Sequence, residues 1–286
     1  MLSLDQFRDR IVTPERLEKL FELNPNRKEY IEKMSPDFDY RYIVIEDALM
    51  NPYDVRDFLI NGAYMAGTND LNPTKTGAPG MQQPVANEWA KPYIQYLRNL
   101  LFHKKITTKD ITWHDFHCYN NVFWKGMKSI DSNYRPHVDP GDFAFNLYLT
   151  DDMVDDGTAM YSLNVGSKKF MDVREMQENA ELRSSTIASI MDIDRVGVGQ
   201  LDDWKCFKGD DVYNLECVVP GAFNHISGYR GSLFHSAYYD DQKYPDGHVR
   251  FSLVAMLSVT NPPAGKSSFI TKKSEDPEYQ DGKKQS

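Results

Sequence analysis

Residues 135–142 read RPHVDPGD and come directly before an apolar run, residues 143–149, that predicts a β-strand. His137 and Asp139 are two positions apart, and alternate residues of an extended chain point to the same side. Both side chains can therefore be directed at one point in space. An imidazole and a carboxylate that converge in this way supply two ligands for a metal ion, so the pattern predicts a metal site beside a strand-rich core.

The third ligand is expected to be His235, in the sequence GSLFHS at residues 231–236, where it ends an apolar strand segment. Two histidines and one carboxylate on one face, with the other positions open, form the ligand set typical of non-haem Fe(II). Taken alone, His137 is also explained as a turn histidine and Asp139 as a turn-capping residue before Pro-Gly. The complete set favours the metal.

Arg250 and Ser252 add a second feature on the next apolar strand, where they share one face. A planar guanidinium beside a metal suits a co-substrate that carries a carboxylate. The other histidines fit the metal site less well. His225 precedes a glycine-rich turn that would carry it away from the other ligands, while His114 and His117 face opposite sides of a strand unless a bulge intervenes.

Together these motifs resemble the Fe(II)- and 2-oxoglutarate-dependent dioxygenase superfamily, in its prolyl-hydroxylase-like branch, over residues 110–260. The resemblance implies a mainly β fold with flanking helices (α+β), whose core is a double-stranded β-helix of the jelly-roll or cupin-like kind. It also implies roles for six residues: His137, Asp139 and His235 as metal ligands, Arg250 as the partner of the distal carboxylate of 2-oxoglutarate, and Ser252 and Tyr148 as its helpers.

The chain departs from the family pattern at three places. The sequence DGTAMY at residues 156–161 resembles the family's Gly-Gly-x-Thr-x-Phe, with Asp156 in place of the first glycine. Residues 163–219 are longer than expected. Arg250 lies further from the second histidine than is usual, with residues 239–249 predicted as a hairpin excursion. These departures leave the substrate open.

The resemblance implies an enzyme that uses Fe(II), 2-oxoglutarate and O2, and that couples decarboxylation of 2-oxoglutarate to succinate with hydroxylation of a substrate C–H bond. Halogenating relatives have Gly or Ala at the position of Asp139, so its carboxylate favours hydroxylation. Desaturation, ring closure and demethylation use the same triad and stay open. So do a cupin-type metalloenzyme that does not use 2-oxoglutarate and a non-catalytic jelly-roll binding module.

Composition narrows the partners. The 286-residue chain has a formal net charge of −9, and because phosphate binding needs a basic face, nucleic acid is not expected. A small molecule or a protein side chain is the expected substrate. The N-terminus has no signal-peptide layout, no apolar run approaches a membrane span, and Cys118, Cys206 and Cys217 have no disulfide-framework spacing. We therefore expect a cytoplasmic protein with free thiols.

The chain is predicted to form one domain with three parts. Residues 1–110 form an N-terminal support region of helices and a strand, residues 111–260 form the catalytic core with an insertion at 163–214, and residues 261–286 form a polar, poorly ordered tail. Four helices are expected: after Thr13, after Asn51, over residues 87–102 and over residues 173–182. A strand is expected over residues 40–46. Residues 66–86 predict a long loop, either a mobile flap near the site or a plain surface loop.

Turn residues predict where the core strands are interrupted. Asn120-Asn121 is expected to join two aromatic strands, and Pro220-Gly221 and the glycine-rich residues 228–231 to separate three short ones. In residues 143–150, Phe and Leu occupy one side and Ala144, Asn146 and Tyr148 the other. The second side would line the interior.

Overall fold

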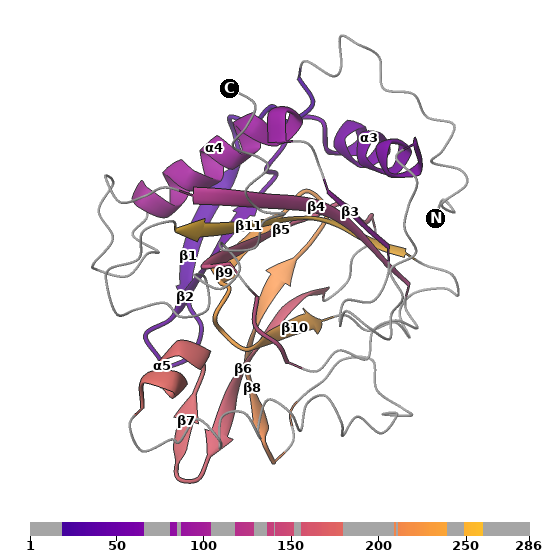
Figure 1. Cartoon of the computed structure of the whole chain (residues 1–286). Coiled ribbons are helices and arrows are strands. Elements are labelled where there is room, and N and C mark those ends of the chain that lie inside the picture. Colours follow the sequence, from indigo (N-terminus) through magenta and orange to yellow (C-terminus); the bar gives the residue numbers. More distant parts are fainter. Residues whose placement is uncertain are drawn as a thin grey trace.

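The structure is a computed structural model that describes residues 19–65, 81–84, 87–103, 118–128, 136–139, 141–151, 156–179, 209, 211–238 and 249–259. Within these residues the regular structure is mostly β-strand, arranged in a large and a small antiparallel sheet (Figure 1). No helix in the described part of the chain is long and apolar enough to span a membrane.

The larger sheet has seven strands in the order β1-β2-β9-β5-β11-β4-β3, and all neighbours are antiparallel. Its strands are β1 (Lys28–Lys33), β2 (Arg41–Glu46), β3 (Met81–Pro84), β4 (Cys118–Lys128), β5 (Phe143–Tyr148), β9 (Ile226–Arg230) and β11 (Val249–Val259). The predicted strand over residues 40–46 is confirmed as β2.

The smaller sheet is built around β6 (Asp156–Val165). β10 (His235–Tyr238) and β7 (Lys168–Phe170) pair with successive parts of β6, and β8 (Tyr213–Gly221) pairs with it from Asp156 to Leu163. A β-bridge between His137 and His235 adds the segment that carries His137 next to β10.

The path of the chain between the sheets defines the fold. From β4 it passes to the small sheet at His137, to the large sheet at β5, and to the small sheet for β6 and β8. It then returns to the large sheet at β9, to the small sheet at β10, and to the large sheet at β11. This alternation of eight antiparallel segments is a double-stranded β-helix, a form of jelly roll. The predicted fold class is confirmed.

Two helices, α3 (Pro52–Met65) and α4 (Asn87–His103), confirm the helices predicted after Asn51 and over 87–102, and they cover one face of the large sheet (Figure 1). The alternation in β5 explains why. One side of this strand contributes Phe143, Phe145 and Leu147 to an apolar cluster that includes helix residues such as Val55, Leu59, Ile94 and Leu97. The other side faces the interior between the sheets, as predicted. Burial of the first side therefore fixes which residues line the interior.

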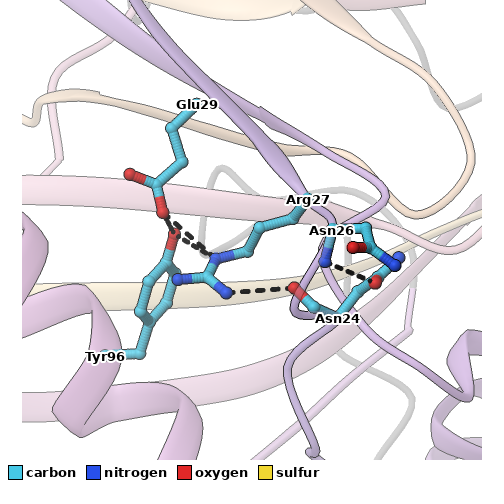
Figure 2. A network of polar contacts seen from close by, with 5 residues as sticks. All are labelled: Asn24, Asn26, Arg27, Glu29 and Tyr96. Carbon is cyan, nitrogen blue, oxygen red and sulfur yellow. Dashed lines mark hydrogen bonds and ion pairs between the residues drawn. The ribbon is translucent and has the colours of Figure 1, made fainter.

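A polar network connects the outermost strand of the sheet to α4 (Figure 2). Arg27 Nε donates to Tyr96 Oη and to Glu29 Oε1, both at 3.1 Å, and the Tyr96 hydroxyl donates to the same Glu29 oxygen at 2.7 Å. Arg27 Nη1 donates to the Asn24 carbonyl at 3.0 Å, and Asn24 Oδ1 accepts from the Asn26 amide. The network holds α4 against the edge of the sheet at β1.

The predicted turn at Asn120-Asn121 is wrong. Both residues lie inside β4, which pairs with β11 along its whole length, with Asn120 opposite Leu257 and Asn121 opposite Met256. Two consecutive asparagines favour a turn locally, but hydrogen bonding along an unbroken ladder outweighs that preference.

The predicted interruptions at Pro220-Gly221 and at residues 228–231 are also misplaced. Pro220 and Gly221 belong to β8, and Gly228 belongs to β9, opposite Phe145. A Cβ at Gly228 would lie 2.3 Å from the Phe145 ring, so this glycine serves close packing inside a strand. The chain turns instead at residues 222–225 and 231–234, and His235 begins β10 rather than ending a strand.

Within the predicted insertion, the structure contains β7 and a short helix, α5 (Val173–Glu178), where a helix over 173–182 was expected. The predicted loop at 66–86 is wrong at β3, which pairs with β4. Several other predictions lie outside the described residues: the helix after Thr13, loop residues 66–80, His114, His117, residues 239–248, Cys206 and the tail at 261–286. The division into three parts stays a prediction.

Candidate metal centre

The structure brings His137, Asp139 and His235 together at one end of the interior. One ligand atom from each lies within 4.8 Å of the other two. His235 Nε2 is 3.2 Å from Asp139 Oδ2, and His137 Nε2 is 4.0 Å from Asp139 Oδ1. The His235 side chain is 4% exposed and that of His137 is 40% exposed, so His137 stands at the mouth of the site. Among the described residues, this is the one group of its kind with metal-ligand spacing.

Backbone hydrogen bonds set this arrangement. The amide of His137 donates to the His235 carbonyl at 2.8 Å, and the amide of His235 donates back at 2.9 Å. The Asp139 amide donates to the Gly231 carbonyl at 2.8 Å, which places the carboxylate two residues further along the same extended segment. Two segments about a hundred positions apart in the chain are thereby held in register, and this register explains why the three side chains converge.

A hydrogen bond orients His235. Its Nδ1 lies 2.8 Å from the Leu233 carbonyl oxygen. Because a carbonyl can only accept, Nδ1 carries a proton, and Nε2 is the ring nitrogen that faces Asp139. The imidazole ring is also packed between the rings of His137 and Tyr229, with centroid distances of 4.5 and 4.9 Å. A histidine held in this tautomer is prepared to bind a metal through Nε2.

A buried ion network lies behind the two ligand segments, and the sequence analysis missed it. Asp172, which has no exposed surface, accepts from Ser232 Oγ at 2.9 Å and from the Arg174 amide at 2.8 Å, and pairs with Arg230 at 3.2 Å. Arg174 Nη2 in turn binds Asp142 Oδ1 at 2.6 Å. The network joins the turn after Asp139 to the turn before His235. Asp172 was recognisable as a helix cap, but its partners could only be found in three dimensions.

The predicted carboxylate-binding residues line the same pocket as the triad. Arg250, on β11, donates from Nη2 to the Gly157 carbonyl at 2.7 Å, and its guanidinium lies 5.1 Å from the centre of the Tyr148 ring. Ser252 is directly opposite Tyr148 on β5. The Tyr148 hydroxyl is 3.0 Å from Thr158 Oγ1. Burial raises the pKa of Tyr148, so the hydroxyl stays protonated and able to donate at neutral pH.

The pocket extends along β5 from the Tyr148 end to the metal end and holds about 70 Å³ of space for water-sized molecules. Between them stands Asn146, whose Nδ2 donates to Tyr229 Oη at 3.0 Å. Burial raises the pKa of Tyr229 well above its usual value, and the nearby Asp139 charge adds to the effect. Tyr229 was not singled out from the sequence because its segment was expected to be a turn.

The rival ligand His225 is not part of the site. It lies in the turn between β8 and β9, where its carbonyl accepts from the Tyr148 amide at 2.9 Å. Its side chain is absent from the pocket lining and from the group with metal-ligand spacing. Burial lowers the pKa of His225, while the charges of Glu46 and Asp47 oppose that effect. Among the described residues, the structure brings His235, and not His225, to His137 and Asp139.

No protein-family model matches the sequence, and no characterised protein matches it by sequence. Solved structures do match. In fold, the chain is similar to solved structures that include a 2OG-Fe(II) oxygenase and a prolyl-4-hydroxylase. A Pseudomonas putida prolyl-4-hydroxylase aligns over 86% of this chain and 98% of its own, with 9% identity and a TM-score of 0.40.

Two further solved structures also align with most of this chain. HygX from Streptomyces hygroscopicus, which has nickel and 2-oxoglutarate bound, aligns over 87% of this chain and 88% of its own, with 11% identity and a TM-score of 0.40. A 2OG-Fe(II) oxygenase from Burkholderia pseudomallei aligns over 91% and 92%, with 9% identity and a TM-score of 0.35.

Proposed function

We propose that the protein is an Fe(II)- and 2-oxoglutarate-dependent oxygenase of the hydroxylase type. One observation carries the proposal: a His-Asp-His group with metal-ligand spacing and a buried arginine with an adjacent tyrosine and serine line one pocket. The proposed substrate is a small molecule or a protein side chain, and the proposed location is the cytoplasm. An acidic chain of net charge −9 does not favour nucleic acid.

The donor set fits Fe(II). Two imidazole nitrogens and one carboxylate oxygen match the facial triad that leaves coordination positions open for other ligands. The proton on His235 Nδ1 is fixed by the Leu233 carbonyl, so Nε2 is available without a change of tautomer. Asp139 supplies a negative charge that offsets the charge of a divalent ion. His137, Asp139 and His235 would therefore hold the metal.

The opposite end of the pocket fits the distal carboxylate of 2-oxoglutarate. Arg250 offers a planar guanidinium, whose paired N–H groups match a carboxylate better than an ammonium group does. Tyr148 and Ser252, opposite one another on β5 and β11, place two hydroxyl groups beside it. The apolar side chains of Val254 and Met256 also line the pocket. A co-substrate bound to Arg250 would thus have its 2-oxoacid end directed toward the triad.

When bound, iron and 2-oxoglutarate would supply the oxidation of a C–H bond by O2, with release of succinate and CO2. The residues of the chain then have separate tasks. The triad holds the metal at the mouth of the pocket, where the half-exposed His137 leaves an approach for substrate. Arg250, Tyr148 and Ser252 orient the co-substrate. The carboxylate of Asp139 keeps its coordination position filled, which favours hydroxylation over halogenation.

The proposal is tested with His137→Ala, His235→Ala and Arg250→Ala, and with His225→Ala as the matched control outside the pocket. We expect the first two variants to lose Fe(II) binding and 2-oxoglutarate-dependent succinate release. Arg250→Ala should keep iron but need far more 2-oxoglutarate. His225→Ala should behave like the wild type. A His137→Ala, His235→Ala double variant that still releases succinate would refute the triad.

A further inference from the structure

The guanidinium of Arg250 is fixed on three sides by its surroundings. Nη2 donates to the Gly157 carbonyl at 2.7 Å, the Tyr148 ring lies across one face, and Nε lies 3.8 Å from Asp156 Oδ2. The side chain of Arg250 is 8% exposed and that of Asp156 is 1% exposed. The arginine that lines the co-substrate end of the pocket therefore has a buried acid at its Nε edge.

Asp156 changes the charge of the carboxylate subsite. A buried guanidinium next to a buried carboxylate forms a pair of nearly zero net charge, so the attraction that Arg250 exerts on an arriving anion is partly cancelled. Asp156 stands at the first position of the stretch that resembles Gly-Gly-x-Thr-x-Phe, where the pattern has no charge. The next position, Gly157, has no room for a side chain, because a Cβ there would lie 2.0 Å from the Val219 carbonyl oxygen.

We propose that Asp156 is a specificity-determining counter-charge that limits how tightly Arg250 holds a dicarboxylate. This inference rests on the proposed function. A dicarboxylate that binds only through Arg250 is then held weakly. Only one that also binds at the metal end, through a 2-oxoacid group, is retained. Succinate, which has no 2-oxo group, leaves the pocket readily, so Asp156 suppresses inhibition by the product.

The test measures binding of glutarate, a dicarboxylate that has no 2-oxo group and therefore reports on the Arg250 end of the pocket. Calorimetric titrations compare the wild type with Asp156→Asn, which removes the charge and keeps the shape, and with Asp156→Gly as a second variant. Asp57→Asn is the matched control, because Arg56 Nε and Asp57 Oδ1 form another buried pair at 3.8 Å, outside the pocket.

We expect both Asp156 variants to bind glutarate about tenfold more tightly than the wild type. The carboxylates of Asp156 and of glutarate repel one another across several ångströms at a partly buried site, and removing one of them has an effect of this order. Succinate should inhibit them more strongly by a similar factor, and Asp57→Asn should match the wild type. A gain in affinity cannot come from a damaged fold, which would lower it. Unchanged or weaker glutarate binding in both Asp156 variants would overturn the inference.

The design separates this inference from the proposed function. Arg250→Ala must abolish glutarate binding, and glutarate binding that survives this substitution would overturn the inference. If the wild type binds glutarate through Arg250 but releases no succinate from 2-oxoglutarate, the proposed function fails. The ratio of glutarate affinities between the Asp156 variants and the wild type still decides the role of Asp156.

Discussion

Gly231→Ala is predicted to damage the metal site through the backbone, without touching a metal ligand. A Cβ at residue 231 would lie 2.4 Å from the Gly141 carbonyl oxygen and 3.2 Å from Asp139 Cβ. Carbon and oxygen in contact prefer about 3.3 Å or more, so the turn after Asp139 must move by about 1 Å. This movement stretches the hydrogen bond from the Asp139 amide to the Gly231 carbonyl, now 2.8 Å, and withdraws the carboxylate from the two histidines.

Two magnitudes follow from this geometry. Overpacking against a backbone oxygen that cannot move aside should lower the free energy of unfolding by about 1–3 kcal/mol. Displacing a metal ligand by about 1 Å should weaken Fe(II) binding by about 10- to 100-fold, the range found when the support of a metal ligand is lost. Anaerobic Fe(II) titration gives the second value and urea unfolding gives the first.

Gly166→Ala is the matched control for stability. Gly166 lies in the turn between β6 and β7 at a φ of +60°, and a Cβ added there would have no other atom within 4 Å. An alanine at this position should cost about 1 kcal/mol of backbone strain and leave iron binding unchanged. If Gly231→Ala binds Fe(II) as tightly as the wild type does, the claim that the 231–141 contact positions Asp139 is refuted.

Three other predictions concern the surroundings of the site. Asp172→Asn should lower the free energy of unfolding by about 2 kcal/mol, a value reduced because Arg230 is partly exposed. The variant should also bind Fe(II) about tenfold more weakly than the wild type. Equal affinity for iron would show that the Asp172 network does not position the ligand segments. Because burial raises the pKa of Tyr148, its hydroxyl should stay protonated between about pH 7 and pH 9. Ionisation of Tyr148 should therefore not weaken the binding of 2-oxoglutarate to the wild type over this range. Tyr148→Phe should weaken the affinity for 2-oxoglutarate about fivefold and leave iron binding unchanged. If the wild type loses affinity between about pH 7 and pH 9 and Tyr148→Phe does not, the assignment of Tyr148 as a protonated donor is contradicted.

The parts of the fold that were predictable from the sequence follow short-range rules. The alternation of β5 identified which of its side chains face the interior, and the i, i+2 spacing placed His137 and Asp139 on one side. Arg250 and Ser252 were recognised for the same reason. In each case a period of two residues along a strand is enough to decide where a side chain points.

The predictions that failed depend on contacts between distant segments. Asn120 and Asn121 carry a strong turn preference, yet pairing with β11 keeps them in a strand. Gly228 looks like a loop residue and is needed for close packing against Phe145. The network of Asp172 with Arg230 and Ser232 joins residues about 60 positions apart in the chain. No local pattern marks such contacts, because they exist only when the two sheets have come together.

The most direct test of the central claim is an anaerobic titration of the metal-free protein with Fe(II) and then 2-oxoglutarate, followed by visible absorption. We predict a charge-transfer band from the chelated 2-oxoacid in the wild type, no band in His235→Ala, and in Arg250→Ala a band that forms only at much higher 2-oxoglutarate concentrations. Tight iron binding without a band in the wild type would contradict the use of 2-oxoglutarate, and absence of iron binding would contradict the metal centre itself.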